Sequence, residues 1–306
     1  MAVARSPEPA SAVDGLRSGP QNTVPPNAQA IQPAIVSTDL AVGPNRFVFG
    51  LVDQGTKALV MDAQLHLRLF KLADHGAVES LKGEADAQAL TLEKNYTHVH
   101  QDGTQETHGA GIMGVYVAYL EFDSPGEWGV EITGTADGQA LPTLTRAFDV
   151  RGHSFSPALG EPAPRSVQMT LKDVGDLFEI DTSIPPDPHM HDMTISDAVT
   201  SGKPSVIAFS TPGFCVTQLC GPTKDLVDRL YESHQGEANF IHVEPYNLKK
   251  ARNGQGLEVL PFITGEWGLQ TEPWVFLVDK KGNVAAKFEG VMGFLELEEA
   301  LAKASQ

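Results

Sequence analysis

The chain has 306 residues, of which 41% are hydrophobic and 20% charged, a globular composition that is sufficient for two ordinary domains. Its formal net charge of -17 argues against nucleic acid and anionic membrane as partners, because both require basic patches. The sequence has no run of about 18 apolar residues, so we expect no transmembrane segment.

The first 30 residues are rich in Pro, Ser, Ala and Gly and have no apolar core of the kind found in signal peptides. This composition predicts a disordered tether over residues 1–30. Such tethers often follow a removed export signal or lipid anchor. We therefore expect an extracytoplasmic location, exported or membrane-tethered, with no signal in the chain itself.

Residues 31–150 contain short segments that alternate apolar and polar residues and are separated by turn sequences such as Asp102-Gly103 and Asp137-Gly138. In one of them Leu65, Leu67 and Leu69 should face inward, with His66 and Arg68 facing outward. Several short strands at this spacing predict an antiparallel β-sandwich. The strand pattern loosely resembles the Ig-like domains of exported proteins, some of which handle copper.

Residues 151–170 contain Pro157, Pro162 and Pro164 and are predicted to be a linker, with a second domain over 171–306. The pattern then predicts a short helix beginning after Thr194, a buried strand at 205–210 and a helix at 223–235. A second buried strand is predicted at 238–247, then a surface loop at 249–256, a hairpin at 273–290 and a helix at 294–304. This order, with a buried parallel core, indicates an α/β domain.

Four segments of the second domain carry a family resemblance: VIAF at 206–209, TPGFC at 211–215, CGP at 220–222 and EPWVFLVD at 272–279. Over about residues 188–304 the chain resembles thioredoxin-like domains of the extracytoplasmic, TlpA-like kind. The resemblance implies an α/β thioredoxin fold that exchanges disulfides with protein thiols and needs no cofactor. It assigns the chemistry to Cys215, Cys220 and a cis Pro273. The substrate groove would be formed by Phe214, Gly221, Pro222, Glu272 and Trp274.

The cysteine spacing is C-x4-C, and two helical cysteines five positions apart would lie roughly 8–9 Å apart, too far to bridge. One cysteine must therefore lie outside the helix. A helix that starts near Gly221-Pro222 would make Cys220 the low-pKa thiol, whereas a start at 216 would favour Cys215. By its position after Phe214, we favour Cys215 as the nucleophile and Cys220 as the resolving thiol.

Two departures from the family pattern weaken an active-enzyme interpretation. Aligned on CGP, the resolving position is Thr223, and the buried acid of thioredoxins falls near Ala208. His242 or Glu244 could substitute for that acid. A peroxiredoxin-like peroxidase is an alternative, but Glu272 replaces the activating arginine and a carboxylate there would raise a thiol pKa. A redox-silent scaffold with a structural cysteine pair is a further alternative.

Histidines suggest a metal-binding alternative. His98 and His100 alternate along one segment and could converge on an ion. His191 lies in the segment HMHDM, whose imidazole and thioether groups suit copper. A copper-binding or copper-delivery protein would use the two cysteines together with such a histidine.

Overall fold

The computed structural model describes residues 31–73, 76–99, 105–215 and 219–306. It divides into two compact units. The first comprises the described residues up to Leu90 together with Gly114–His153, and the second comprises Thr91–Met113 and Ser154–Gln306. Within the described ranges, no helix has the length and apolarity needed to cross a membrane.

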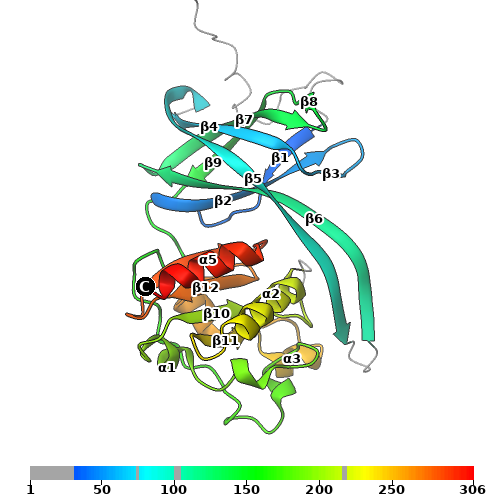
Figure 1. The fold of residues 1–306 in the computed structure, drawn as a ribbon, viewed down its shortest axis with the longest axis vertical. Helices are drawn as coiled ribbons and strands as arrows, with labels where there is room; N and C mark the ends of the chain where they lie inside the picture. Colours follow the sequence, from blue (N-terminus) through cyan, green and yellow to red (C-terminus); the bar gives the residue numbers. More distant parts are fainter. Residues whose placement is uncertain (1–30, 74–75, 100–104, 216–218) are drawn as a thin grey trace, which may run out of the picture. The chain divides into compact units, whose positions relative to one another are not determined.

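A nine-stranded sheet contains the strands of the first half of the chain (Figure 1). Its main path runs β1-β2-β6-β5-β4-β7-β8, with β3 paired to β2 and β9 paired to β7. The strands are β1 (Ile31–Ile35), β2 (Gly43–Asp53), β3 (Leu59–Val60), β4 (Gln64–Leu72), β5 (Val78–Val99), β6 (Gln105–Phe122), β7 (Gly126–Ala136), β8 (Gln139–Ala140) and β9 (Leu144–Val150).

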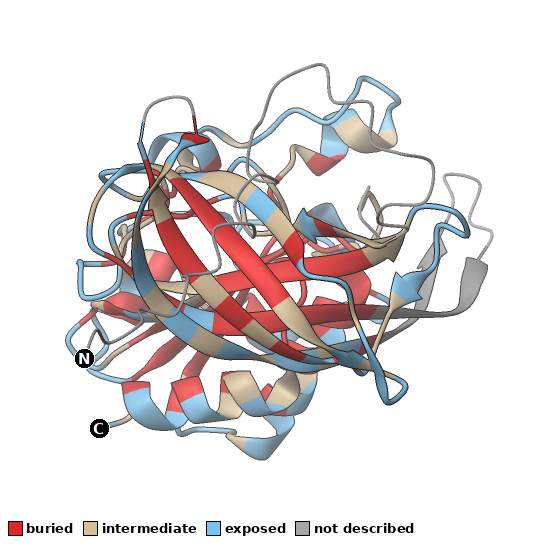
Figure 2. Cartoon of the chain, turned by 90° about the horizontal axis from the view of Figure 1, so that it is seen from above, coloured by how far each residue is buried: buried red, intermediate tan, exposed pale blue. Residues whose placement is uncertain are grey.

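Alternation along the strands builds the core of the first unit (Figure 2). Leu65, Leu67 and Leu69 are buried, whereas His66 and Arg68 between them are partly exposed and pair with acidic neighbours. The predicted inward and outward faces of this segment are therefore confirmed. The same period of two buries the aromatic and aliphatic residues of the other strands: Phe47, Phe49, Leu51, Tyr116, Leu120, Phe122, Trp128, Val130 and Ile132.

The predicted Ig-like β-sandwich is wrong. A sandwich has two packed sheets, whereas here one continuous sheet curls into a nearly closed, barrel-like form. Register shifts in the β4–β5 ladder, between Leu69 and Phe70 and between Lys71 and Leu72, are the irregularities that allow a sheet to bend. Alternating sequences look alike in the two architectures, because both turn one face inward.

A four-stranded sheet in the order β11-β10-β12-β13 forms the centre of the second unit. Its strands are β10 (Ser205–Phe209), β11 (Asn239–Val243), β12 (Trp274–Val278) and β13 (Val284–Glu289). The α-helices are α1 (Ile195–Val199), α2 (Cys220–Ser233), α3 (Leu248–Arg252), α4 (Pro261–Gly265) and α5 (Phe294–Ala304), and the 3₁₀ helices are η3 (Leu177–Glu179) and η4 (Pro188–Met190).

Local signals explain several of these boundaries. The Thr194 hydroxyl accepts the N–H of Asp197 and so caps α1, as predicted. Gly282 adopts a φ of 83° in the turn that joins β12 to β13, a conformation that glycine adopts readily. The predicted closing helix at 294–304 coincides with α5.

The predicted α/β thioredoxin fold is not evident: the chain is mostly β, with 40% strand and 19% helix. The prediction required a buried parallel core, but only β10 and β11 are parallel, and the other two ladders are antiparallel. Three of the helices, α1, α3 and α4, have five residues each. A continuous apolar run indicates that a strand is buried but does not indicate its direction, so the sequence could not decide between a parallel and an antiparallel sheet.

The predicted loop at 249–256 is also wrong in part, because α3 occupies its start.

Candidate functional site

The two cysteines lie at the junction between β10 and α2. Cys215 belongs to the loop that follows β10, and Cys220 is the first residue of α2. The pair approaches to 2.6 Å, and the backbone N–H of Cys220 donates to Cys215 Sγ over 3.2 Å. Neither cysteine forms a disulfide. Because a disulfide bond is about 2.05 Å long, a small movement brings the pair to bonding distance.

The environments of the two thiols differ. Cys215 is partly exposed, and its sulfur accepts an N–H from the first residue of a 14-residue helix. Unpaired N–H groups and the helix dipole stabilise a thiolate at such a position. Cys220 is buried, and burial, together with its hydrogen bond to Cys215, raises the pKa of its thiol. The site therefore combines an accessible sulfur at a helix N-terminus with a buried, protonated thiol.

Glu272 places a carboxyl group beside the pair. One of its oxygens and the two sulfurs all lie within 4.8 Å of one another. The Tyr246 hydroxyl donates to Glu272 Oε2 over 2.8 Å. Burial raises the pKa of Glu272, the hydrogen bond from Tyr246 opposes this, and negative charge on Cys215 adds to it. Glu272 is therefore suited to hold a proton next to the sulfurs.

The other residues assigned by the resemblance differ in exposure. The Glu272–Pro273 peptide bond is cis, as predicted. Phe214 is partly exposed, whereas Gly221 and Pro222 are buried within α2. Trp274 is 2% exposed and packs in the core of the second unit, which leaves it little surface for contact with a substrate.

A groove of about 650 Å³ runs beside α2. Pro212 and Gly221, which flank the cysteine loop, line part of it. Four carboxylates, from Asp187, Asp225, Asp228 and Glu232, also line it, together with Lys224, which pairs with Asp228 over 2.5 Å. Burial raises the pKa values of Asp225 and Asp228. The groove is thus acidic and suits a cationic segment better than an anionic one.

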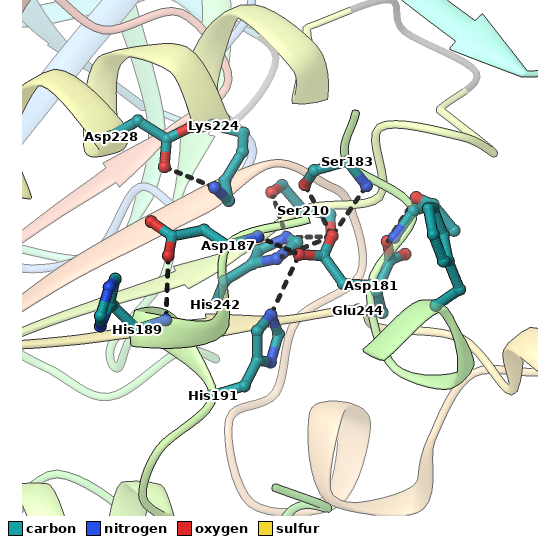
Figure 3. Close-up of polar contacts among 12 residues, drawn as sticks. Asp181, Ser183, Asp187, His189, His191, Ser210, Lys224, Asp228, His242 and Glu244 are labelled. Atoms are coloured by element: carbon teal, nitrogen blue, oxygen red, sulfur yellow. Dashed lines mark hydrogen bonds and ion pairs between the residues drawn. The ribbon is translucent and has the colours of Figure 1, made fainter. Parts of the chain in front are cut away.

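A second cluster of ionisable side chains lies inside the second unit (Figure 3). Asp181 follows η3, His191 directly follows η4, and His242 belongs to β11. Asp181 Oδ2 lies 3.1 Å from His191 Nε2, and Asp181 Oδ1 lies 3.5 Å from His242 Nδ1. The three side chains are 0%, 3% and 0% exposed, respectively, so the cluster is shielded from solvent.

Hydrogen bonds keep the carboxylate of this cluster charged. Burial raises the pKa of Asp181, but the imidazoles of His242 and His191 and the hydroxyl of Ser183 outweigh burial and hold that pKa well below its usual range. Ser183 donates its backbone N–H and its hydroxyl to Oδ1 over 2.7 and 2.6 Å, and the N–H of Asp187 reaches Oδ2 over 3.3 Å. Burial lowers the pKa of His242, so this ring is neutral near pH 7.

Glu244 connects this cluster to the cysteine loop. Its carboxyl accepts the N–H of Thr182 over 2.8 Å and also the Thr182 hydroxyl. The same hydroxyl oxygen accepts the N–H of Gly213 over 2.8 Å, two residues before Cys215. Burial raises the pKa of Glu244 to about 8, so this carboxyl is mostly protonated at neutral pH.

The predicted metal ligands do not form one site in the described residues. His98 belongs to β5, but its side chain and the whole of His100 lie outside the described residues. His191 groups with Asp181 and His242 rather than with the cysteines, which group instead with Glu272.

Sequence reasoning missed Asp181 and Tyr246, and it considered His242 and Glu244 only as substitutes for a thioredoxin acid. A signal for the last two was present, because the strand segment NFIHVEPY places a histidine and a glutamate within an otherwise apolar run. Asp181 carries no such signal. It lies in an irregular segment, where an aspartate is ordinarily a turn residue.

Comparison with known proteins identified no relative: no protein-family model matches the chain, and no curated protein matches it.

Proposed function

We propose that the second unit catalyses thiol–disulfide exchange through Cys215 and Cys220. The observation that supports this most directly is the contact between Cys215 Sγ and the N–H of Cys220 at the start of α2, with the second thiol within bonding reach. A thiolate is the nucleophile in disulfide exchange, and a helix N-terminus lowers the free energy of a thiolate. A structural staple would need neither an accessible sulfur nor a helix N–H directed at it.

In the proposed reaction, the Cys215 thiolate attacks one sulfur of a substrate disulfide. A mixed disulfide forms, the substrate S–S bond breaks, and the first substrate thiolate leaves and takes up a proton. Cys220 then gives up its proton and attacks Cys215, which expels the second substrate thiolate. The chain ends with a Cys215–Cys220 disulfide, and the substrate has gained two electrons and two protons. A dithiol donor returns the enzyme to its reduced form, and the reverse sequence oxidises a substrate dithiol.

Burial supports this division of roles. An attacking sulfur must reach the substrate, and Cys215 is the partly exposed member of the pair. A resolving thiol needs to reach only the other cysteine, and Cys220 is fully buried with a raised pKa. The raised pKa also means that Cys220 needs a proton acceptor before it can attack.

Glu272 is the proposed acceptor. Its carboxyl lies within 4.8 Å of both sulfurs, and burial brings its pKa closer to that of a thiol than in a free glutamate. The proton that Cys220 loses moves to Glu272 and from there to the departing substrate thiolate. Tyr246 orients the carboxyl through the hydrogen bond to Oε2.

Insulin reduction by the full chain, with dithiothreitol or glutathione as the thiol source, tests the proposal. Cys215→Ser should abolish turnover. Cys220→Ser should stop turnover but accumulate a mixed disulfide, because the first step needs only Cys215. His189→Gln changes an exposed residue that is not one of the two cysteines, and it serves as the control. This variant should reduce insulin at the rate of the unmodified chain. The proposal would be refuted if the unmodified chain reduced no insulin with any thiol source, or if Cys215→Ser were fully active.

A second candidate function, soft-metal capture, uses the same atoms. Two sulfurs and one carboxyl oxygen within 4.8 Å of one another form a ligand set in which the thiolates suit Cu(I). Anaerobic Cu(I) titration in competition with glutathione distinguishes the two functions. Binding no tighter than that of glutathione removes this candidate and leaves the exchange proposal intact.

A further inference from the structure

The three side chains of the buried cluster come from two parts of the chain, the segment before α1 and strand β11, and point at one another (Figure 3). The carboxylate of Asp181 lies between the imidazoles of His191 and His242, whose ring centroids are 5.5 Å apart and inclined by 70°. One ligand atom from each of the three lies within 4.8 Å of the other two. Two imidazoles and one carboxylate are a common ligand set for first-row transition metals.

The hydrogen bonds of His242 fix its tautomer. Its Nε2 lies 3.0 Å from both the hydroxyl and the carbonyl oxygen of Ser210, and because a carbonyl oxygen can only accept, Nε2 donates to it. In the neutral ring the lone pair is then on Nδ1, which is buried and has no hydrogen-bond partner. This lone pair faces Asp181 Oδ1 at 3.5 Å. Two acceptors that face each other in a dry interior repel unless a proton or a cation lies between them.

The surroundings of the cluster resemble the outer shell of a metal site. The Ser210 carbonyl accepts a hydrogen bond from His242 Nε2, the ring nitrogen that does not face the cluster. A backbone carbonyl is a usual partner for the second nitrogen of a metal-bound imidazole. Ser183 holds the Asp181 carboxylate through its N–H and its hydroxyl over 2.7 and 2.6 Å. The ligand atoms are therefore positioned before any ion arrives.

The spacing also fits a small ion. Tetrahedral coordination with metal–ligand bonds of 2.0–2.1 Å separates neighbouring ligand atoms by about 3.3 Å. The separations here are 3.1 Å from Asp181 Oδ2 to His191 Nε2 and 3.5 Å from Asp181 Oδ1 to His242 Nδ1, so each carboxylate oxygen lies near this distance from one imidazole nitrogen. Calcium and magnesium are poor candidates, since they prefer six or more oxygen ligands. The absence of sulfur from the three ligands disfavours Cu(I).

We propose that Asp181, His191 and His242 bind one divalent transition-metal ion of the zinc type, through a carboxylate oxygen, Nε2 and Nδ1, respectively. Because the three ligands are shielded from solvent, the ion would have a structural role, with the chain supplying three of the four ligands of tetrahedral coordination. It ties the segment that carries Asp181 and His191 to strand β11.

The ion would also support the cysteine loop. Thr182, the neighbour of Asp181, accepts the N–H of Gly213 through its hydroxyl over 2.8 Å. Loosening of Asp181 therefore releases a contact two residues from Cys215. The metal proposal does not depend on disulfide exchange, because its ligands include neither cysteine.

Cobalt and zinc titrations of the full chain test this site. A Cys215→Ser/Cys220→Ser background removes competing thiols. We expect one Co²⁺ per chain with visible d–d bands, no sulfur-to-cobalt charge-transfer band, and displacement by Zn²⁺. Asp181→Asn and His191→Gln should each weaken binding at least about tenfold. His189→Gln, which changes an exposed histidine two residues away, should bind as the parent does.

A readout on the unmodified chain covers the case in which the ligand variants fail to fold. Zn²⁺ should raise its thermal unfolding midpoint, chelation should lower it, and bound Co²⁺ should show the nitrogen- and oxygen-ligated spectrum. Folded parent protein that shows no d–d bands with its thiols removed would overturn the proposal, as would equal binding by folded His191→Gln. Either result would leave the cluster as a purely hydrogen-bonded one. Disulfide exchange could still be intact in that case, so the two proposals can fail separately.

Discussion

The interiors of the two units differ in kind. In the first unit the buried residues are mainly apolar, and the buried carboxylates Asp39 and Glu131 each lie near an arginine at the surface. In the second unit a whole set of ionisable groups is buried around β10, β11 and the start of α2. Its members are Asp181, His191, Cys220, Lys224, His242 and Glu244.

Burying an ionisable group costs free energy unless hydrogen bonds or an opposite charge compensate. The first unit largely avoids this cost, because most polar residues of its strands face outward and its two buried carboxylates each lie near an arginine. The second unit instead buries ionisable groups with shifted pKa values in the same unit as Cys215 and Cys220, a pattern that is common at functional sites. We therefore expect substitutions in the first unit to change stability, and those in the polar interior of the second to change pH dependence and chemistry.

Leu67→Ala should have the largest effect of these substitutions. Leu67 is fully buried in the core of the first unit, so its truncation should lower the free energy of unfolding by about 3 kcal/mol. The rate of disulfide exchange, measured where the protein is still folded, should stay within about twofold, since a core truncation leaves the cysteine site unchanged. His66→Ala, the partly exposed neighbour, should change stability by less than about 0.5 kcal/mol. A large loss of disulfide-exchange rate in folded Leu67→Ala would mean that substitutions in the first unit change the chemistry as well as the stability.

Glu244→Gln should remove a pH dependence that arises in the second unit. The folded-state pKa of Glu244 is about 8 against 4.5 for a free glutamate, so the folded state binds the extra proton. The contribution is fully present below pH 4.5 and is lost as pH rises toward 8, at up to roughly 1.4 kcal/mol per pH unit. Denaturant unfolding across this range should show a flatter curve for Glu244→Gln.

Glu299→Gln is the matched control for this measurement, because it changes an exposed carboxyl on α5. Its stability curve should follow that of the unmodified chain. An unmodified chain whose stability does not fall between pH 5 and 8 would contradict a neutral, buried Glu244.

Tyr246→Phe should act on the chemistry with a smaller effect. The hydrogen bond from the Tyr246 hydroxyl lowers the pKa of Glu272, so its loss should raise that pKa. The pH–rate profile of disulfide exchange should shift upward accordingly, with less than about a tenfold change in the maximal rate. Tyr119→Phe, an exposed tyrosine of the first unit, should leave the profile in place. An unshifted profile in Tyr246→Phe would argue against Glu272 as the proton carrier.

Substrate charge should have the smallest effect. The groove beside the cysteine loop carries four carboxylates, so a cationic disulfide peptide should react a few-fold faster than an anionic one at low salt. Asp225→Asn should narrow the difference, whereas Asp149→Asn on β9 should not. Equal rates for both peptides at low salt would mean that substrates do not use this groove.

Local sequence patterns determined much of this protein. Alternation predicted the inward face of β4, a hydroxyl before an apolar run predicted the cap at Thr194, and the helix pattern at 294–304 coincides with α5. The closeness of Cys215 to Cys220 also pointed to the junction of β10 and α2. These features are readable because each depends on residues a few positions apart.

Tertiary structure alone decided the rest. Alternation does not specify which strands pair, so the curled nine-stranded sheet and the parallel pairing of β10 with β11 could not be foreseen. Nor does any local signal bring Asp181 to His242, or Tyr246 to Glu272, because these contacts join segments far apart in the chain. Such convergence depends on the path of the whole backbone, and it is there that the buried polar interior of the second unit arises.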